Sequence, residues 1–496
     1  MDYEVALRVT RSFSGGCPPA FSNIHGNSPA LPPFMKAVYF FPLLVLLVSA
    51  PLVEAAERKP NIIIVFCDDL GYADIGPFGA KKHATPVLDQ MAREGMRLTD
   101  FYSTCPVCTP SRSSLMTGCY PRRVNMQVDE QNLCVLFPAA RKGLNPEEVT
   151  IAEVLKEQNY STMCIGKWHL GDHPDFMPTN HGFDHYFGIP YSNDMNRKEV
   201  PLPLVRDLTV IRDRVQKETT ITAQYTAEAV NFIKSNSSKP FFLYLPHTAV
   251  HLPLVPGEKF KGSSEGGAYG DWVQEIDWSM GELFKTIKSE GIDKHTLVLF
   301  TSDNGSAREK QGSNLPLRGR KGRTDEGGMR VPCLVRWPGR IPAGSSSGAL
   351  TCTMDLLPTA AAISGSEVSK IPLIDGKNIW PILSGKSQDH PREAFFYYQM
   401  DQLQAVRSGD WKLFVAMDSK KRNWGKPEGK KALALYNLAK DIHEDNNVAA
   451  ENPDIVQQLL AHAEAAREDL GDVDRPGKGQ REAGWVEQAS PRLLKQ

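Results

Sequence analysis

Two apolar, β-branched segments, each followed by polar residues with side-chain oxygens, constrain the fold of this 496-residue chain most strongly. The segments at 61–66 and 296–300 have the continuous apolar pattern of strands buried on both faces of a sheet. Open parallel sheets build their sites at the carboxyl ends of strands, so we expect the polar residues there to meet at one edge. These residues are Asp68, Asp69, Asp303 and Asn304.

Strand-like and helical segments alternate through the region 57–389, which we interpret as one large domain. Strand followed by helix over this span indicates an α/β fold, with a large, mostly parallel sheet sandwiched by helices. Apolar runs predict the strands, and apolar residues at helical spacing predict the helices. The further strands expected are 162–165 and 240–245, and the helices are 86–94, 151–158 and 221–235.

The pattern changes after residue 390, where short strand-like runs with turn residues between them predict a small antiparallel sheet. The runs are 395–399, 404–407 and 410–415, and a closing helix is expected at 453–470. We therefore expect a C-terminal α+β subdomain over 390–470. The polar tail 471–496 is expected to fray.

The N-terminal region has the pattern of an export signal. Met35 and Lys36 precede an apolar run at 37–48, and a small-residue cleavage pattern follows, which predicts a signal peptide over 35–56. Residues 1–34 are polar and rich in Gly, Pro and Ser, which indicates a non-native or disordered extension with translation starting at Met35. A membrane anchor is the alternative, but the run is short for spanning a bilayer, so no stable membrane partner is expected. We expect a periplasmic, extracellular or lumenal protein.

The polar residues at the two strand ends suit a hard cation. They offer three carboxylates and one amide oxygen, without His or Cys, which favours Ca²⁺ or Mg²⁺ over zinc. Asp and Asn also follow strands as ordinary turn formers, so either pair alone is ambiguous.

Residues 108–118 begin with a thiol and carry a guanidinium four residues later. Cys108 at the start of a predicted short helix, with Arg112 behind it, indicates an anion site and a depressed thiol pKa. One alternative is an ordinary helix start that ends at Gly118. Another is a redox or metal-binding pair formed with Cys105, which would make a CxxC motif.

Basic residues follow two further predicted strands. Lys167 and His169 come directly after one strand, on either side of a tryptophan, and His247 and His251 follow the other. A single Lys or His is more often solvated or structural, but two within three residues beside an aromatic ring favour a site.

The Gly- and Arg-rich loop at 318–332 contains Lys321. Such a loop can be a solvated basic patch for nucleic acid. The chain as a whole has 57 Lys and Arg against 58 Asp and Glu, a net charge of −1, so no nucleic-acid partner is expected.

Several of these segments, in order, resemble the motifs of the type I, formylglycine-dependent sulfatases of the arylsulfatase and N-acetylgalactosamine-6-sulfatase kind. Residues 108–112 read Cys-Thr-Pro-Ser-Arg and match the Cys-x-Pro-Ser-Arg signature, and 166–169 match Gly-Lys-Trp-His. The family's histidine before an x-Pro pair corresponds to His251, and its lysine before Gly-x-Thr-x-Glu-Gly-Gly corresponds to Lys321. The segment 435–447 resembles the family's C-terminal hairpin.

The resemblance, over about residues 60–450, implies an alkaline-phosphatase-like fold and hydrolysis of a sulfated small molecule or glycan, with carbohydrate preferred to aryl sulfates. In the family the signature cysteine is oxidised to formylglycine, so Cys108 would need a formylglycine-generating maturation enzyme. The metal site would hold calcium, with magnesium as the alternative. Its residues would be Asp68, Asp69, Asp303, Asn304 and the group derived from Cys108.

The resemblance also assigns roles to the basic residues. Arg112, Lys167 and Lys321 would meet the charge of the sulfate while the hydrate derived from Cys108 attacks sulfur, and Ser192 would supply a hydroxyl near it. Lys321 and His251 would protonate the leaving oxygen. His169 would then deprotonate the remaining hydroxyl, which expels sulfate.

Several alternative functions remain open at this point. A phosphonate or phosphate-diester hydrolase of the same superfamily uses the same cysteine motif. An inactive relative that binds sulfated glycans would lack catalysis altogether. A two-zinc phosphatase would need more His and Asp ligands, and a CxxC oxidoreductase leaves Lys167, Lys321 and the four oxygen ligands unexplained.

Overall fold

The computed structural model describes residues 58–492, except 197, 216–218, 308–310, 368–372, 423–425 and 474. The predicted extension 1–34 and signal peptide 35–56 therefore lie outside the described residues. Within the described part of the chain, no helix combines the length and the apolar character needed to cross a membrane.

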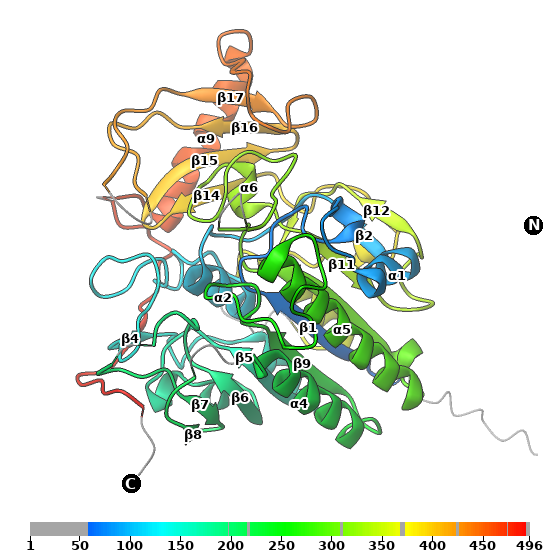
Figure 1. The fold of residues 1–496 in the computed structure, drawn as a ribbon. Coiled ribbons are helices and arrows are strands. Elements are labelled where there is room, and N and C mark those ends of the chain that lie inside the picture. The colour runs from blue at the N-terminus through cyan, green and yellow to red at the C-terminus, as the bar shows by residue number, and fades with distance from the viewer. Residues whose placement is uncertain are drawn as a thin grey trace, which may run out of the picture. The chain divides into compact units, whose positions relative to one another are not determined.

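A large sheet with a parallel centre forms the middle of the part of the chain before residue 390 (Figure 1). In sheet order its strands are β12 (Ser345–Ser347), β2 (Met96–Leu98), β11 (Cys333–Arg336), β10 (Thr296–Ser302), β1 (Asn61–Cys67), β9 (Phe241–Pro246), β5 (Ser161–Lys167), β6 (His185–Ile189), β7 (Leu204–Arg206) and β8 (Thr209–Arg212). The five strands from β10 to β6 run parallel, and β11 and β7 pair with them in the antiparallel sense. The central strands are buried almost throughout, as strands between two helix layers must be.

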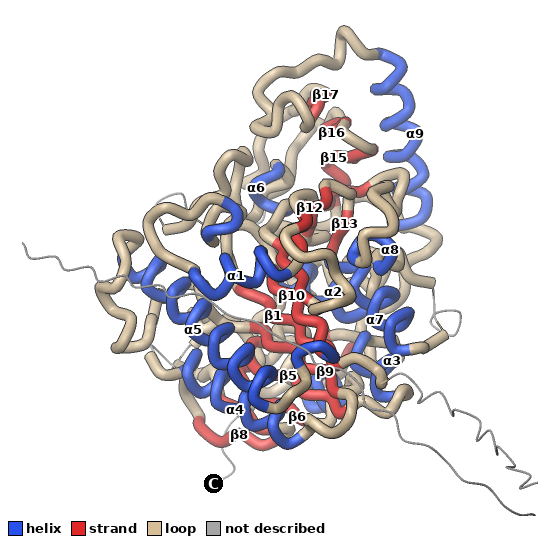
Figure 2. The backbone as a smooth tube through the Cα atoms, turned by 90° about the vertical axis from the view of Figure 1, so that its right-hand side faces the viewer, coloured by secondary structure: helices blue, strands red, loops and turns tan. Residues whose placement is uncertain are grey.

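Helices cover both faces of this sheet. The first layer contains α1 (Pro86–Glu94), α4 (Ile221–Ser235) and α5 (Gly267–Ser289), and the second contains α2 (Cys108–Thr117), α3 (Ile151–Lys156), α7 (Leu356–Ser364) and α8 (Trp380–Leu383). Figure 2 shows the two groups on opposite sides of the strands. The predicted α/β sandwich is confirmed.

The register of two strands brings the predicted ligands together. β1 and β10 pair in parallel from Asn61 opposite Thr296 to Cys67 opposite Ser302. The next residue on each strand is an aspartate, so Asp68 and Asp303 leave the sheet side by side, as the two apolar segments predicted.

A second, antiparallel sheet forms the C-terminal part. Its strands, in order, are β14 (Phe395–Gln399), β15 (Gln402–Ser408), β16 (Trp411–Phe414) and β17 (Ala434–Asn437). Helix α9 (Pro453–Leu470) packs on β15 and β16 through apolar residues such as Leu459 and Ala463. Both the sheet and the helix were expected.

The expectation that the tail frays is wrong for much of it. In the tail, β18 (Gly484–Trp485) pairs with β4 (Lys142–Gly143). Elsewhere in the chain, β3 (Phe101–Tyr102) and β13 (Thr351–Cys352) form another two-stranded sheet. Arg481 donates to both carboxylate oxygens of Glu148 (2.7 Å each). The tail is held to the rest of the chain by ion pairs and backbone hydrogen bonds, which use polar residues. A polar composition is also typical of disordered segments, so the sequence alone does not distinguish the two.

Candidate active site

Helix α2 holds Cys108 at the carboxyl edge of the large sheet. Val107 before it is extended (φ −147°, ψ 161°), and the helix ends at Gly118, whose φ of 68° favours a residue without a Cβ. The Gly118 N–H donates to the Ser114 carbonyl oxygen (2.9 Å). Every residue of α2 is buried, which fixes the position of the thiol.

The Cys108 thiol lies between an acidic and a basic side chain. Its Sγ is 3.4 Å from Asp68 Oδ1 and 3.4 Å from Lys321 Nζ. Burial and the Asp68 carboxylate raise the pKa of the thiol well above its usual value, against the effect of the Lys167 and Lys321 ammonium groups. The expected depressed pKa is therefore wrong, because desolvation outweighs the helix terminus and the nearby cations. Cys105 is likewise a buried free thiol, not disulfide-bonded to Cys108.

Arg112 and Lys167 neutralise two buried carboxylates. Arg112 donates through Nε and Nη2 to Asp303 Oδ2 (3.1 and 2.8 Å), and Lys167 Nζ lies 2.6 Å from Asp68 Oδ2. Burial alone would raise the pKa of Asp68, but the Lys167 ammonium and its neighbours hold it well below the usual range. Burial and the Asp68 charge raise the pKa of Asp303 to about 6.

Asp69 connects the metal-ligand candidates to the basic residues. Lys321 Nζ lies 2.6 Å from Asp69 Oδ1, and Asn304 Nδ2 donates to the same oxygen (2.8 Å). His251 Nε2 lies 3.7 Å from Asp69 Oδ2. The side-chain oxygen of Asn304 is buried and accepts no hydrogen bond from the described residues.

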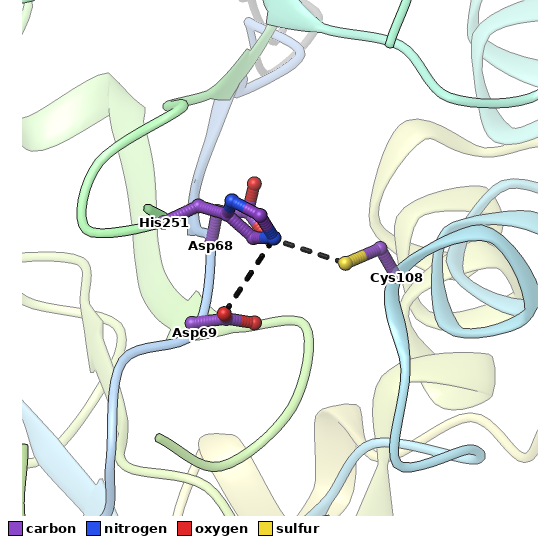
Figure 3. Close-up of side chains that lie close together, drawn as sticks. All are labelled: Asp68, Asp69, Cys108 and His251. Atoms are coloured by element: carbon purple, nitrogen blue, oxygen red, sulfur yellow. Dashed lines mark hydrogen bonds and ion pairs between the residues drawn. The ribbon is translucent and has the colours of Figure 1, made fainter. Parts of the chain in front are cut away.

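Four of these side chains gather closely enough to surround one ion. One potential ligand atom from each lies within 4.8 Å of the others, and Figure 3 shows the four side chains close together. The four residues are Asp68, Asp69, Cys108 and His251. Of the contacts between them, His251 pairs with Asp69, and the Cys108 thiol contacts Asp68. Asp303, which was expected in the ligand set, has one oxygen on Arg112 and accepts the Asp69 N–H with the other (3.1 Å).

The two site histidines have their tautomers fixed by carbonyl groups. His169 Nε2 lies 3.0 Å from the Leu136 carbonyl oxygen, which can only accept, so Nε2 carries the hydrogen and Nδ1 has the lone pair. Burial and Lys167 lower the pKa of His169 well below its usual value, so the ring is neutral. His251 Nδ1 lies 2.7 Å from the Leu252 carbonyl oxygen, which leaves Nε2 directed to Asp69.

A cavity of 170 Å³ joins these groups. Of the predicted residues it is lined by Cys108, His169, Ser192, His251 and Lys321. Arg112 and Lys167 lie behind this lining, fully buried on the carboxylates. His247 is buried near the Tyr225 ring, and neither of its ring nitrogens bonds to a described residue, which fits a packing role.

The cavity also contains residues that sequence reasoning missed: Val135, Phe137, Asp194 and Met195. Asp194 Oδ1 lies 3.9 Å from His251 Nδ1. Its position two residues after Ser192 was a signal that could have identified it. The three apolar residues belong to no motif, and only the folded chain brings them to the site.

The comparisons with known proteins agree with this geometry. Residues 60–366 match the Sulfatase family, and residues 390–491 match the C-terminal region of aryl-sulfatase. N-acetylgalactosamine-6-sulfatase of Canis lupus familiaris is 38% identical over 398 residues, which cover 75% of this chain and 74% of that protein. Arylsulfatase A of Homo sapiens is 36% identical over 450 residues, which cover 82% and 87%.

A solved structure extends the similarity to the whole fold. The crystal structure of Ps i-CgsB in complex with k-i-k-neocarrahexaose has a TM-score of 0.72 and 30% identity, and the match covers 82% of this chain and 92% of that one. The family match spans more than half of the sequence, and its residues include every group that surrounds Cys108. The chain therefore belongs to the sulfatase family and is an enzyme that hydrolyses sulfate esters.

Proposed function

We propose that this sulfatase cleaves carbohydrate sulfate esters in the cavity at Cys108, with Cys108 converted to formylglycine and one calcium ion beside it. The observation that carries the proposal is convergence: a cysteine, a lysine, two histidines and a serine from five separate segments line one 170 Å³ cavity. The names of the N-acetylgalactosamine-6-sulfatase relative and of the neocarrahexaose complex favour a carbohydrate substrate over an aryl sulfate.

The donor atoms suit a hard cation. Asp68, Asp69, Asp303 and Asn304 would hold it, because they offer only oxygen and the Asn304 side-chain oxygen is buried without a hydrogen bond from the described residues. Calcium is the first choice and magnesium the second. When bound, the ion supplies positive charge against the sulfate oxygens. His251 is close but offers nitrogen, which hard cations do not favour, so we assign it to proton transfer.

The thiol is poorly suited to attack by itself, because burial and Asp68 keep it protonated. Formylglycine, as a hydrated aldehyde, supplies one oxygen that attacks sulfur and a second hydroxyl, whose deprotonation would reform the aldehyde and expel the sulfate. Residue 108 is the first residue of a fully buried helix, and this fixed position would set the direction of attack on sulfur.

The cations of the site would bind the substrate anion. Lys321 lines the cavity and reaches within 3.4 Å of Cys108 Sγ, while Arg112 and Lys167 add charge from behind. Ser192, in the cavity wall, would donate a hydrogen bond from its hydroxyl to the sulfate. In a buried site such fixed charges stabilise a developing anion more strongly than water does.

The proposed reaction needs two proton transfers. His169 Nδ1 has a lone pair and no hydrogen bond to a described residue, so it would accept the proton of the second hydroxyl. Lys321 Nζ, an ammonium group at the cavity, would deliver a proton to the leaving oxygen. His251 Nε2 would do so only from the doubly protonated ring, because Nδ1 already donates to the Leu252 carbonyl oxygen.

Several further assignments belong to the same proposal. We propose a catalytic domain over 57–389 and a C-terminal subdomain over 390–470, export from the cytoplasm, and a formylglycine-generating enzyme as the maturation partner. Binding of nucleic acid or of a membrane forms no part of the proposed activity.

The test combines peptide mass with turnover. The Cys108 peptide should show the mass change from CH₂SH to CHO, and Cys108→Ala should abolish hydrolysis of sulfated sugars while Cys105→Ala retains most of it. Equal loss in both variants would favour a redox pair. A wild-type preference for phosphate diesters over every sulfate ester would overturn the assigned substrate.

A further inference from the structure

A groove of 560 Å³ lies on the other side of the loop that carries Lys321. One wall is formed by residues 318–325 of that loop. The other is formed by residues of β16 and β17 and, from the described residues between these strands, by Met417, Lys420, Glu428, Lys431 and Ala432. The cations that line it are Arg318, Arg320, Arg323, Lys420 and Lys431, and the carboxylates are Asp325 and Glu428. Cations therefore outnumber carboxylates here, in a chain whose net charge is −1.

Both carboxylates of the groove already have partners. Asp325 Oδ1 accepts from Arg318 Nε (3.1 Å). Glu428 is shared between Lys431 Nζ at 3.1 Å and Arg323 Nη2 at 3.5 Å. Arg320 is exposed and Lys420 half-buried, and neither side chain forms an ion pair with a residue that the structure describes. The surplus of positive charge is thus centred on these two side chains.

The groove and the active site share the same short loop. Arg320 and Arg323 form a tight turn, closed by the Arg323 N–H donating to the Arg320 carbonyl oxygen (3.0 Å), and Lys321 stands between them. Lys321 directs its ammonium group to Asp69 and Cys108, whereas the arginines on either side line the groove. A long anionic ligand could therefore meet both sites at once.

We propose that this groove binds a second anionic group, a sulfate or carboxylate, on a polyanionic glycan whose scissile sulfate lies at Cys108. The proposal rests on the proposed function, because it deepens the substrate class from one sulfated sugar to a multiply charged chain. Nucleic acid fits less well: single strands stack bases on open aromatic faces, and here Lys420 lies over Phe414 (5.2 Å) and Arg318 over Tyr436 (5.4 Å).

The test measures binding apart from turnover. A sulfated chondroitin hexasaccharide is titrated calorimetrically into Cys108→Ala, which should bind the ligand without turnover, and into Cys108→Ala/Arg320→Gln/Lys420→Gln, at low and at high salt. The matched control is Arg93→Gln/Lys285→Gln, which removes one Arg and one Lys from exposed positions on α1 and α5. Turnover of nitrophenyl sulfate, which has a single anionic group, is measured with Cys108 present and serves as the check that each pair of substitutions leaves the protein folded.

We expect the groove variant to bind the hexasaccharide roughly tenfold more weakly at low salt, as loss of two ionic contacts requires. With Cys108 present, the groove variant should turn over nitrophenyl sulfate at the wild-type rate. The control variant should match the protein without its two substitutions in both hexasaccharide binding and turnover. Unchanged hexasaccharide binding would overturn the proposal, and so would tighter binding of a single-stranded oligonucleotide of equal charge. Groove-dependent binding in a protein that hydrolyses no sulfate ester would support the groove and refute only the proposed function.

Discussion

Lys412 Nζ lies 3.0 Å from Glu326 Oε1, and both side chains are fully buried. Lys412 belongs to β16 of the C-terminal sheet, whereas Glu326 begins α6 (Glu326–Met329), five residues after Lys321. The same ammonium group lies 2.9 Å from Glu444 Oε1 and donates to the Thr324 carbonyl oxygen (2.8 Å). Figure 1 shows α6 beside β14 and β15. The C-terminal sheet thus holds the end of the loop that brings Lys321 to the active site.

Replacing Lys412 should destabilise the protein strongly. Lys412→Met leaves the Glu326 carboxylate buried without this cation, and removal of one partner of a buried ion pair costs about 3–5 kcal/mol. Urea denaturation at neutral pH measures this loss in the free energy of unfolding. Lys430→Met is the control, because Lys430 and its partner Asp418 (3.3 Å) are both exposed. A loss no larger than in the control would show that the network does not hold the sheet to the loop.

A buried glutamate on α5 should give the protein a specific pH dependence. Burial raises the pKa of Glu275 from 4.5 to about 7, although its carboxylate accepts the Gly257 N–H (2.7 Å). At a pH between these two pKa values, Glu275 holds a proton in the folded state but has lost it in the unfolded state. The free energy of unfolding therefore falls as pH rises through this range.

Glu275→Gln keeps an acceptor for the Gly257 N–H but cannot titrate. We therefore expect the variant to lose part of the decrease in unfolding free energy between pH 4.5 and 7, measured by urea denaturation at pH 5 and pH 8. Glu282→Gln, on the same helix and less buried, should follow the wild type. An equal change in unfolding free energy between pH 5 and pH 8 in Glu275→Gln and in the wild type would contradict the raised pKa of Glu275.

The strand ends could be predicted because a run of β-branched residues is a local signal in the sequence, and parallel sheets place the residues that follow their strands at one edge. Asp68 beside Asp303 follows directly from the pairing of β1 with β10. The raised pKa of Cys108 could not be predicted, since it depends on burial by residues from many segments. The pairing of Lys412 with Glu326 joins positions 86 residues apart, and neither residue carries a local signal of its partner.

Metal analysis should find calcium or magnesium at about one per chain, because the candidate ligands offer oxygen. Asp303→Ala should lower both metal content and turnover, and it also frees Arg112 from its carboxylate. Asp375→Ala is a useful control, because it removes one of the two carboxylate partners of another buried arginine, Arg123, away from the cavity. Two tightly bound zinc ions per chain would instead indicate a phosphatase-like site.

The assignment of proton donors predicts a dependence on the leaving group. A sugar alkoxide is a poor leaving group and needs a proton, whereas nitrophenolate leaves almost without one. Lys321→Ala and His251→Ala should therefore reduce kcat/KM for a sulfated sugar far more than for nitrophenyl sulfate. General acid catalysis of this kind contributes about 10²–10⁴-fold. His247→Ala is the control, since His247 is buried outside the cavity lining. Comparable losses on both substrates would assign Lys321 and His251 to sulfate binding and leave the leaving oxygen without a donor.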